Sequence, residues 1–284
     1  MRNILIPTDF SDNATNAINF GLNLFKYDIC VFYFLHVYQD ELYSEENQIN
    51  RNNFKEVEKR MSDKSLKQLQ DLIADLKKKY PNPKFSFRII SANSLLVDEI
   101  DKIVEEQDID IIVMGTQGKT NNKMITFGSN TLQVLKYVSC PVLVIPEHYT
   151  YNKPKHILFT TNYLIPYKRR ELKLLCEMAC PYRAKIDILY VSNSNKLSLR
   201  QEDNKLFIKD TLCKNETNFL IINDNNITEA INTFVTQNKI DMLVMVNTRH
   251  SHLENILFQS KLDEISLNSK IPLLAFQNIE REIH

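Results

Sequence analysis

The stretch Met114–Asn130, MGTQGKTNNKMITFGSN, is the one around which the rest of the chain is organised. Three of the protein's four glycines fall in this window, at Gly115, Gly118 and Gly128. An average chain of this length holds roughly twenty glycines. The apolar run Ile109–Met114 predicts a buried strand, and the apolar periodicity of Ser129–Val138 predicts a helix. The glycines therefore lie between a strand and a helix N-terminus.

A glycine-rich loop at this place suits a phosphate group. Glycine permits positive φ and lets backbone N–H groups approach a ligand closely. The helix N-terminus adds unpaired donors and the positive end of the helix dipole. The spacing is G-x2-G-x9-G-S, with Lys119 in the loop and Ser129 and Asn130 at the helix start. We predict phosphate or nucleotide binding, the simpler alternative being a loop whose glycines only make turns.

This window resembles the nucleotide-binding motif of the universal stress protein family, G-x2-G-x9-G-(S/T), in the ATP-binding branch of that family. Asn3–Ser11 resembles the family's first strand and acidic turn, Leu35–Val37 the end of its second strand, and Cys140–Pro146 its last strand. The resemblance covers residues 1–146 well and the remainder in outline. It implies binding of ATP, or a related adenine nucleotide, and a regulatory part in a stress response.

Composition and charge narrow the class of protein. The 284 residues suffice for two domains of average size. Formal net charge is zero and no basic stripe stands out, which argues against nucleic acid as a partner. The longest apolar run, Ile29–Val37, is too short to span a bilayer, so no membrane partner is expected. Five scattered cysteines do not form a disulfide framework, and we expect a cytoplasmic protein.

Strands and helices alternate along the first half of the chain. Helical periodicity follows Ser11 or Asp12 and recurs over residues 54–80 and 95–104, between apolar segments at 3–7, 29–37 and 85–90. Such alternation implies a parallel sheet with right-handed crossovers. The expected fold class is α/β, Rossmann-like, with five parallel strands. The family resemblance implies the strand order 3-2-1-4-5.

The same pattern restarts after a polar segment, Glu147–Pro154. Residues 156–162 echo the first strand, residues 240–245 echo Ile109–Met114, and residues 271–276 echo the last strand. This is an internal repeat of domain size. We therefore predict a nucleotide-binding domain at 1–146, a linker at 147–154 and a degenerate domain of the same family at 155–284.

The two halves differ at the positions that concern nucleotide binding. We align Asn247 with Gly115, Gln259 with Gly128 and Asn162 with Asp9, and His250 lies near the position of Gly118. A glutamine at the helix start adds a side chain where phosphate oxygens would meet the backbone. The second half is thus predicted to keep the fold without the nucleotide, and to serve as a built-in partner for the first.

The resemblance and the motif together give a set of nucleotide contacts. The ligand crevice of an open parallel sheet lies at the carboxyl ends of its strands, where Pro7, Thr8 and Asp9 are expected. The family resemblance implies that Asp9 and the backbone at Val37 line the nucleoside end. The phosphates are expected at the glycine loop, with Mg²⁺ left open. The predicted contacts are Pro7, Thr8, Asp9, Val37, Met114, Gly115, Gly118, Lys119, Gly128, Ser129 and Asn130.

The sequence signals for metal binding and for catalysis are weaker than the signal for nucleotide binding. His250 and His252 lack an evident third metal ligand, and neither a G-x-S-x-G nor a P-loop pattern occurs. No catalytic residue is predicted, so an enzyme would at most hydrolyse ATP slowly. The main alternative is an interaction or scaffold module that uses no nucleotide.

The repeat also predicts how the halves assemble. In the resembled family the last strand commonly pairs with its copy across a two-fold axis. Here the copies are Pro141–Ile145 and Pro272–Phe276, on one chain. An unpaired apolar edge strand is an aggregation hazard, and pairing the two removes both edges. We expect a pseudo-dimer of the two halves, with a homodimer of whole chains left open.

Overall fold

A computed structural model describes residues 1–44, 54–116, 127–165, 167–193, 196–212, 215–247 and 270–277. The elements of the first half are β1 (Arg2–Pro7), α1 (Asp12–Leu24), β2 (Cys30–Val37), α2 (Gln39–Ser44), α3 (Phe54–Lys79), β3 (Phe85–Ala92), α4 (Leu96–Glu106), β4 (Ile111–Gly115), α5 (Ser129–Tyr137) and β5 (Val142–Ile145). Those of the second half are β6 (His156–Thr160), α6 (Arg169–Ala179), η2 (Cys180–Tyr182), β7 (Lys185–Val191), α7 (Leu199–Thr211), β8 (Thr217–Ile222), α8 (Ile227–Gln237), β9 (Met242–Asn247) and β10 (Leu273–Gln277).

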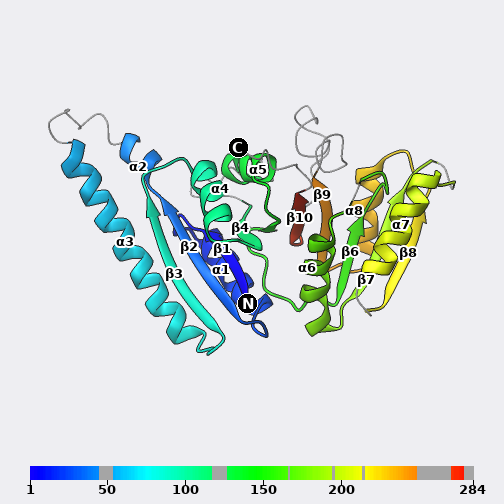
Figure 1. The fold of residues 1–284 in the computed structure, drawn as a ribbon, viewed down its shortest axis with the longest axis horizontal. Coiled ribbons are helices and arrows are strands. Elements are labelled where there is room, and N and C mark those ends of the chain that lie inside the picture. The colour runs from blue at the N-terminus through cyan, green and yellow to red at the C-terminus, as the bar shows by residue number, and fades with distance from the viewer. Residues whose placement is uncertain are drawn as a thin grey trace.

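All of these strands form one sheet, with helices on both of its faces (Figure 1). The order is β3-β2-β1-β4-β5-β10-β9-β6-β7-β8. Neighbours within each half are parallel, whereas β5 and β10 pair antiparallel, with Leu143 opposite Leu274. Each half therefore has the order 3-2-1-4-5. The predicted fold class, two tandem five-stranded parallel α/β units, is confirmed.

The sheet separates two hydrophobic cores. Successive side chains of a strand point to opposite faces. Ile4 and Ile6 accordingly join the core under α1, α3, α6 and α7, whereas Leu5 joins the core under α4, α5 and α8. β2 is buried over nearly its whole length, as its uninterrupted apolar run predicts for an interior parallel strand. Both cores continue from one half of the chain into the other.

The internal repeat is visible in matched backbone contacts. The carboxylate of Asp110 accepts the N–H of Asn3 at 2.9 Å, and the carboxylate of Asp241 accepts the N–H of His156 at the same distance. Phe10 and Tyr163, each following the strand that opens its half, both have left-handed backbone with φ of 62° and 55°. A left-handed backbone is rare for aromatic residues, so its recurrence at matching positions supports an internal repeat.

The strand pairings correct one detail of the repeat. Leu5 lies opposite Ile112, and Leu158 lies opposite Leu243. Counting forward from these pairs places Val246 at the position of Gly115 and Asn247 at that of the next residue. The alignment of Asn247 with Gly115 is thus wrong by one residue. The other aligned positions of that loop, at 250 and 259, lie outside the described residues.

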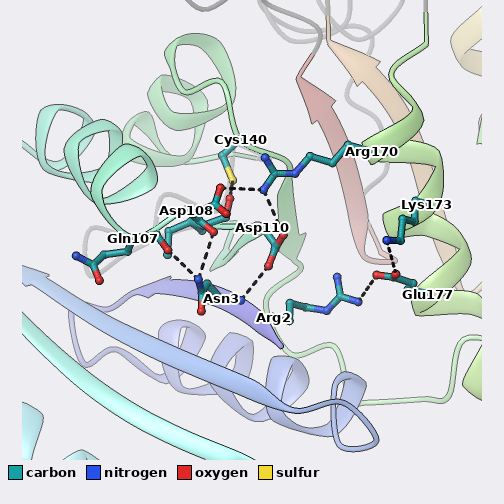
Figure 2. A network of polar contacts seen from close by, with 10 residues as sticks. Arg2, Asn3, Gln107, Asp108, Asp110, Cys140, Arg170, Lys173 and Glu177 are labelled. Carbon is teal, nitrogen blue, oxygen red and sulfur yellow. Dashed lines mark hydrogen bonds and ion pairs between the residues drawn. The ribbon is translucent and has the colours of Figure 1, made fainter.

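Polar contacts also join the halves beside the β5–β10 pair. The guanidinium of Arg170 on α6 lies 3.2 Å from Asp110 and 3.5 Å from Asp108, and Arg2 on β1 lies 2.9 Å from Glu177 (Figure 2). Arg170 is more than half exposed, so its ion pairs contribute little. Arg2 is buried, whereas the side chain of its partner Glu177 is 44% exposed, so only one side of this pair is shielded from water.

The segment predicted as a polar linker is packed against the first half. The rings of Tyr149 and Tyr151 meet Phe20 of α1 edge-on, with centroids 5.9 and 5.3 Å apart. The side-chain amide of Asn16 donates to the carbonyl oxygen of Tyr149 at 3.1 Å. The boundaries of the predicted domains remain predictions, but residues 147–154 are held by their tyrosines in a defined place.

Candidate functional site

A pocket of about 230 Å³ opens at the carboxyl ends of β1, β2 and β4, beside the N-terminus of α5. Nine of the eleven predicted nucleotide contacts line it: Pro7, Thr8, Asp9, Val37, Met114, Gly115, Gly128, Ser129 and Asn130. The other two, Gly118 and Lys119, lie outside the described residues. Segments more than a hundred residues apart in sequence thus meet around one hollow.

Local hydrogen bonds fix the loop after β1. The N–H of Thr8 donates to the carbonyl of Leu35 at 2.8 Å, which extends the pairing of β1 with β2. The Thr8 hydroxyl accepts the N–H of Phe10 at 3.1 Å, and the Asp9 carboxylate accepts the N–H of Ser11 at 3.0 Å. Ser11 in turn caps α1 by accepting the N–H of Ala14 at 3.2 Å. These turns hold Asp9 at the rim of the pocket.

The start of α5 is formed by a glycine, which has no side chain to cap the helix. Gly128 is its N-cap residue, with φ of −64° and ψ of 160°, and within the described residues no side chain caps the helix. The N–H of Gly128 donates to the carbonyl of Thr116 at 2.7 Å, and the Thr131 hydroxyl donates to that of Gly115 at 2.9 Å. The helix start is therefore tied to the end of β4. A helix N-terminus of this kind attracts anions.

The reason for glycine at these positions differs from the one expected. Among the described glycines none has a positive φ. Gly115 instead permits close packing, since an added Cβ would lie 2.8 Å from Cγ and Nδ2 of Asn13, which would have to shift. Asn13 sits on the first turn of α1 and is buried. Glycine here lets α1 approach β4 directly below the pocket.

Sequence reasoning missed six lining residues: Ala14, Leu35, His36, Glu41, Leu96 and Thr131. His36 stands out because it is polar and only 3% exposed. Its Nδ1 lies 2.8 Å from the Ser65 hydroxyl, which is 2.6 Å from that of Ser91. The imidazole also contacts the ring of Phe10 at 4.7 Å between centroids. The signal for His36 was its place at the end of β2, next to the predicted Val37.

The corresponding region of the second half is filled by side chains. Tyr163 and Tyr190 are buried against each other, their centroids 5.5 Å apart, where the first half has Phe10 and His36. The amide of Gln201 donates to the Tyr190 hydroxyl at 3.2 Å, and the hydroxyls of Thr161 and Tyr167 are in contact. Val246 adds an isopropyl group where the first half has Gly115.

The described part of the chain shows neither a metal-binding cluster nor a membrane-spanning helix. It holds no group of three or more His, Cys, Asp or Glu residues placed to bind a metal ion. None of its helices is both long and apolar enough to cross a membrane. His250 and His252, considered above as metal ligands, are outside it.

Comparisons of the sequence with known proteins identify one family and its members. The Universal stress protein family matches residues 1–146, just over half of the chain. Universal stress protein MJ0577 of Methanocaldococcus jannaschii is 29% identical over 154 residues, covering 51% of this chain and 94% of that protein.

Two solved structures are similar over nearly the whole chain. A universal stress protein from Archaeoglobus fulgidus has a TM-score of 0.66 at 15% identity, covering 97% of this chain and 96% of its own. A structure described as a putative universal stress protein from Pseudomonas aeruginosa has a TM-score of 0.58 at 12% identity, covering 98% and 93%. These two similarities concern the fold alone, and each covers both halves of the chain. The family match over residues 1–146, more than half of the sequence, shows that this chain belongs to the universal stress protein family.

Proposed function

We propose that the first half of this universal stress protein binds ATP, or a related adenine nucleotide, in the pocket between β1, β2, β4 and α5. The observation that carries the proposal is the meeting of nine predicted contact residues around one hollow at the carboxyl ends of parallel strands. Beside it lies a helix start that no side chain caps among the described residues. Ligands of open α/β sheets bind at this edge.

The pocket divides into two regions of different chemistry. The nucleoside belongs at Pro7–Asp9 and Val37, where strand ends and the Asp9 carboxylate offer backbone and side-chain hydrogen bonds. The phosphates belong at Gly128–Asn130, where the first N–H groups of α5 and its dipole favour negative charge. A divalent cation would be held by the phosphate oxygens. Gly118 and Lys119 complete the motif in sequence.

The second half is proposed to bind no nucleotide and to act as a permanent partner of the first. In support, tyrosines fill its corresponding region, and β10 pairs with β5. We propose domains at 1–146 and 155–284 joined by 147–154, a cytoplasmic location and a regulatory stress-response function. The second candidate, a scaffold without a nucleotide, draws on the same β5–β10 pairing.

The test is calorimetric titration of ATP into the full chain and into Gly128→Gln. A charge-assisted hydrogen bond contributes about 1.5–3 kcal/mol, so blocking the helix start should weaken ATP binding at least about tenfold. Lys209→Gln, on the exposed face of α7, adds the same residue far from the pocket and should leave affinity unchanged. An unaltered affinity in folded Gly128→Gln would place the phosphates elsewhere, and a wild-type chain that binds no adenine nucleotide would favour the scaffold.

A further inference from the structure

The two helices that flank the pocket both end against the second half. α1 and α5 each line the pocket with their first turns, through Ala14 and through Ser129–Thr131. The last four carbonyl groups of an α-helix lack partners within the helix. In both helices, some of these carbonyls receive hydrogen bonds from side chains of the second half.

The contacts at α5 are made by two buried amides. The carbonyl of Leu135, in the last turn of α5, accepts Nδ2 of Asn247 at 2.6 Å and Nε2 of Gln277 at 2.9 Å. Asn247 also donates to Oε1 of Gln277 at 2.9 Å, so the two amides orient each other. Asn247 is 4% exposed and Gln277 is 1% exposed. A carbonyl buried without such partners is costly, so these amides support the helix end strongly.

A tyrosine makes the matching contact at α1. The hydroxyl of Tyr182, in η2 of the second half, lies 2.6 Å from the carbonyl of Leu24 and 3.0 Å from that of Asn23. Tyr151, from the segment between the halves, approaches both the Asn23 carbonyl, at 3.3 Å, and the Tyr182 hydroxyl, at 3.1 Å. The end of α1 is therefore capped from outside its own half as well.

We propose that Asn247, Gln277 and Tyr182 are positioning residues of the first half's pocket: the second half caps the far ends of α1 and α5 and so holds their pocket ends in place. This inference rests on the proposed function for its effect on ATP, and on the contacts alone for its effect on the helices. α5 spans only Ser129–Tyr137, so fraying of its last turn extends close to its phosphate-facing start.

The proposal gives the degenerate half a definite use. Its residue Asn247 follows directly on Val246, the position at which the glycine of the first half has been lost. Gln277 closes β10, the strand that pairs with β5. Asn247 and Gln277 thus belong to the half that is proposed to bind no nucleotide, and they support the proposed phosphate site of the other half.

The test uses the full chain with Asn247→Leu and Gln277→Met, which approximate the shapes of the amides without donating hydrogen bonds. Asn238→Leu is the control, since Asn238 donates to the Phe234 carbonyl at the end of α8, an exposed helix-end contact entirely within the second half. A fourth variant, Tyr182→Phe, keeps the ring and removes only the hydroxyl. Amide hydrogen exchange and titrations with ATP and adenosine are measured for each.

The expected result separates positioning from general stability. Exchange of α5 amides should quicken in Asn247→Leu and Gln277→Met, and that of the last turn of α1 in Tyr182→Phe. Loss of one capping hydrogen bond should weaken ATP binding about 5- to 10-fold in the α5 variants, while adenosine binding changes less than about twofold. Asn238→Leu should change neither.

Two results would overturn the inference. One is unaltered exchange of α5 in folded Asn247→Leu and Gln277→Met. The other is an equal loss of ATP and adenosine affinity, which would mean a general destabilisation. If the wild-type chain binds no ATP, the proposed function fails, and the exchange measurement still decides whether the second half holds the helices.

Discussion

Replacing Gly115 by alanine tests why glycine stands at the end of β4. An ideal Cβ there would lie 2.8 Å from Cγ and Nδ2 of Asn13 and 3.0 Å from its Oδ1. Asn13 is only 7% exposed, so it has little room to withdraw. Overpacking of this kind costs about 1–3 kcal/mol. Alanine regains about 0.5–1 kcal/mol from the lower freedom of its unfolded chain. We expect Gly115→Ala to destabilise the protein by about 0.5–2 kcal/mol.

A double-mutant cycle isolates the contact. In an Asn13→Ala background the overlapping atoms are gone, so Gly115→Ala should become neutral or stabilising by up to about 1 kcal/mol. Urea denaturation of the four proteins gives the coupling energy, expected at about 1–3 kcal/mol. If Gly115→Ala has the same effect in both backgrounds, to within about 0.5 kcal/mol, close approach of α1 does not explain the glycine.

Three further predictions address other parts of the molecule. Burial raises the pKa of the Glu171 carboxyl from 4.5 to about 7, so the free energy of unfolding should fall by up to about 3 kcal/mol as pH rises through that window. Urea denaturation at pH 4.5 and pH 8 should show this fall in the wild-type protein and not in Glu171→Gln, and a fall that persists in the variant would contradict the prediction. Residues 1–150 alone leave β5 unpaired and should self-associate or aggregate, whereas a strictly monomeric mass at high concentration would count against the pairing. Calorimetry should find one ATP per chain, and two equivalent sites would refute the asymmetry of the halves.

The fold could be predicted well from the sequence because strands and helices each leave a local pattern of apolar residues. Apolar runs of strand length alternate with helical periodicity, and a buried parallel strand such as β2 needs apolar side chains on both faces. α7 was missed because it has little apolar face, with only Gln201 and Ile208 buried. A signal for it existed in the capping box formed by Ser198 and Gln201.

The candidate site was predicted only in part, because some of its residues leave a local signal in the sequence and others do not. Backbone-dominated positions such as Gly115 and Gly128 leave a mark in composition, since glycine is otherwise scarce. His36 leaves no such mark in composition, and its one signal was its place beside Val37. Its burial depends on Ser65 from α3 and on Phe10 from another loop, which the sequence does not bring together. The one-residue error at Asn247 arose because the register is decided by strand pairing and not by the resemblance of apolar runs.

The contacts between the halves explain how two copies of one fold can diverge on a single chain. In a symmetric dimer, every residue at the interface must serve both subunits, because the interface is self-complementary. Joining the copies removes that constraint. Here Gly115 lets α1 approach β4 below the first half's pocket, while the second half has Val246 at the matching position. The amide of Asn247, the next residue, donates to the carbonyl of Leu135 in α5. A glycine at 246 would not recreate a pocket, since Tyr163 and Tyr190 remain buried there. The proposed absence of a nucleotide site in the second half and its proposed support of the site in the first half would thus both follow from the same release from symmetry.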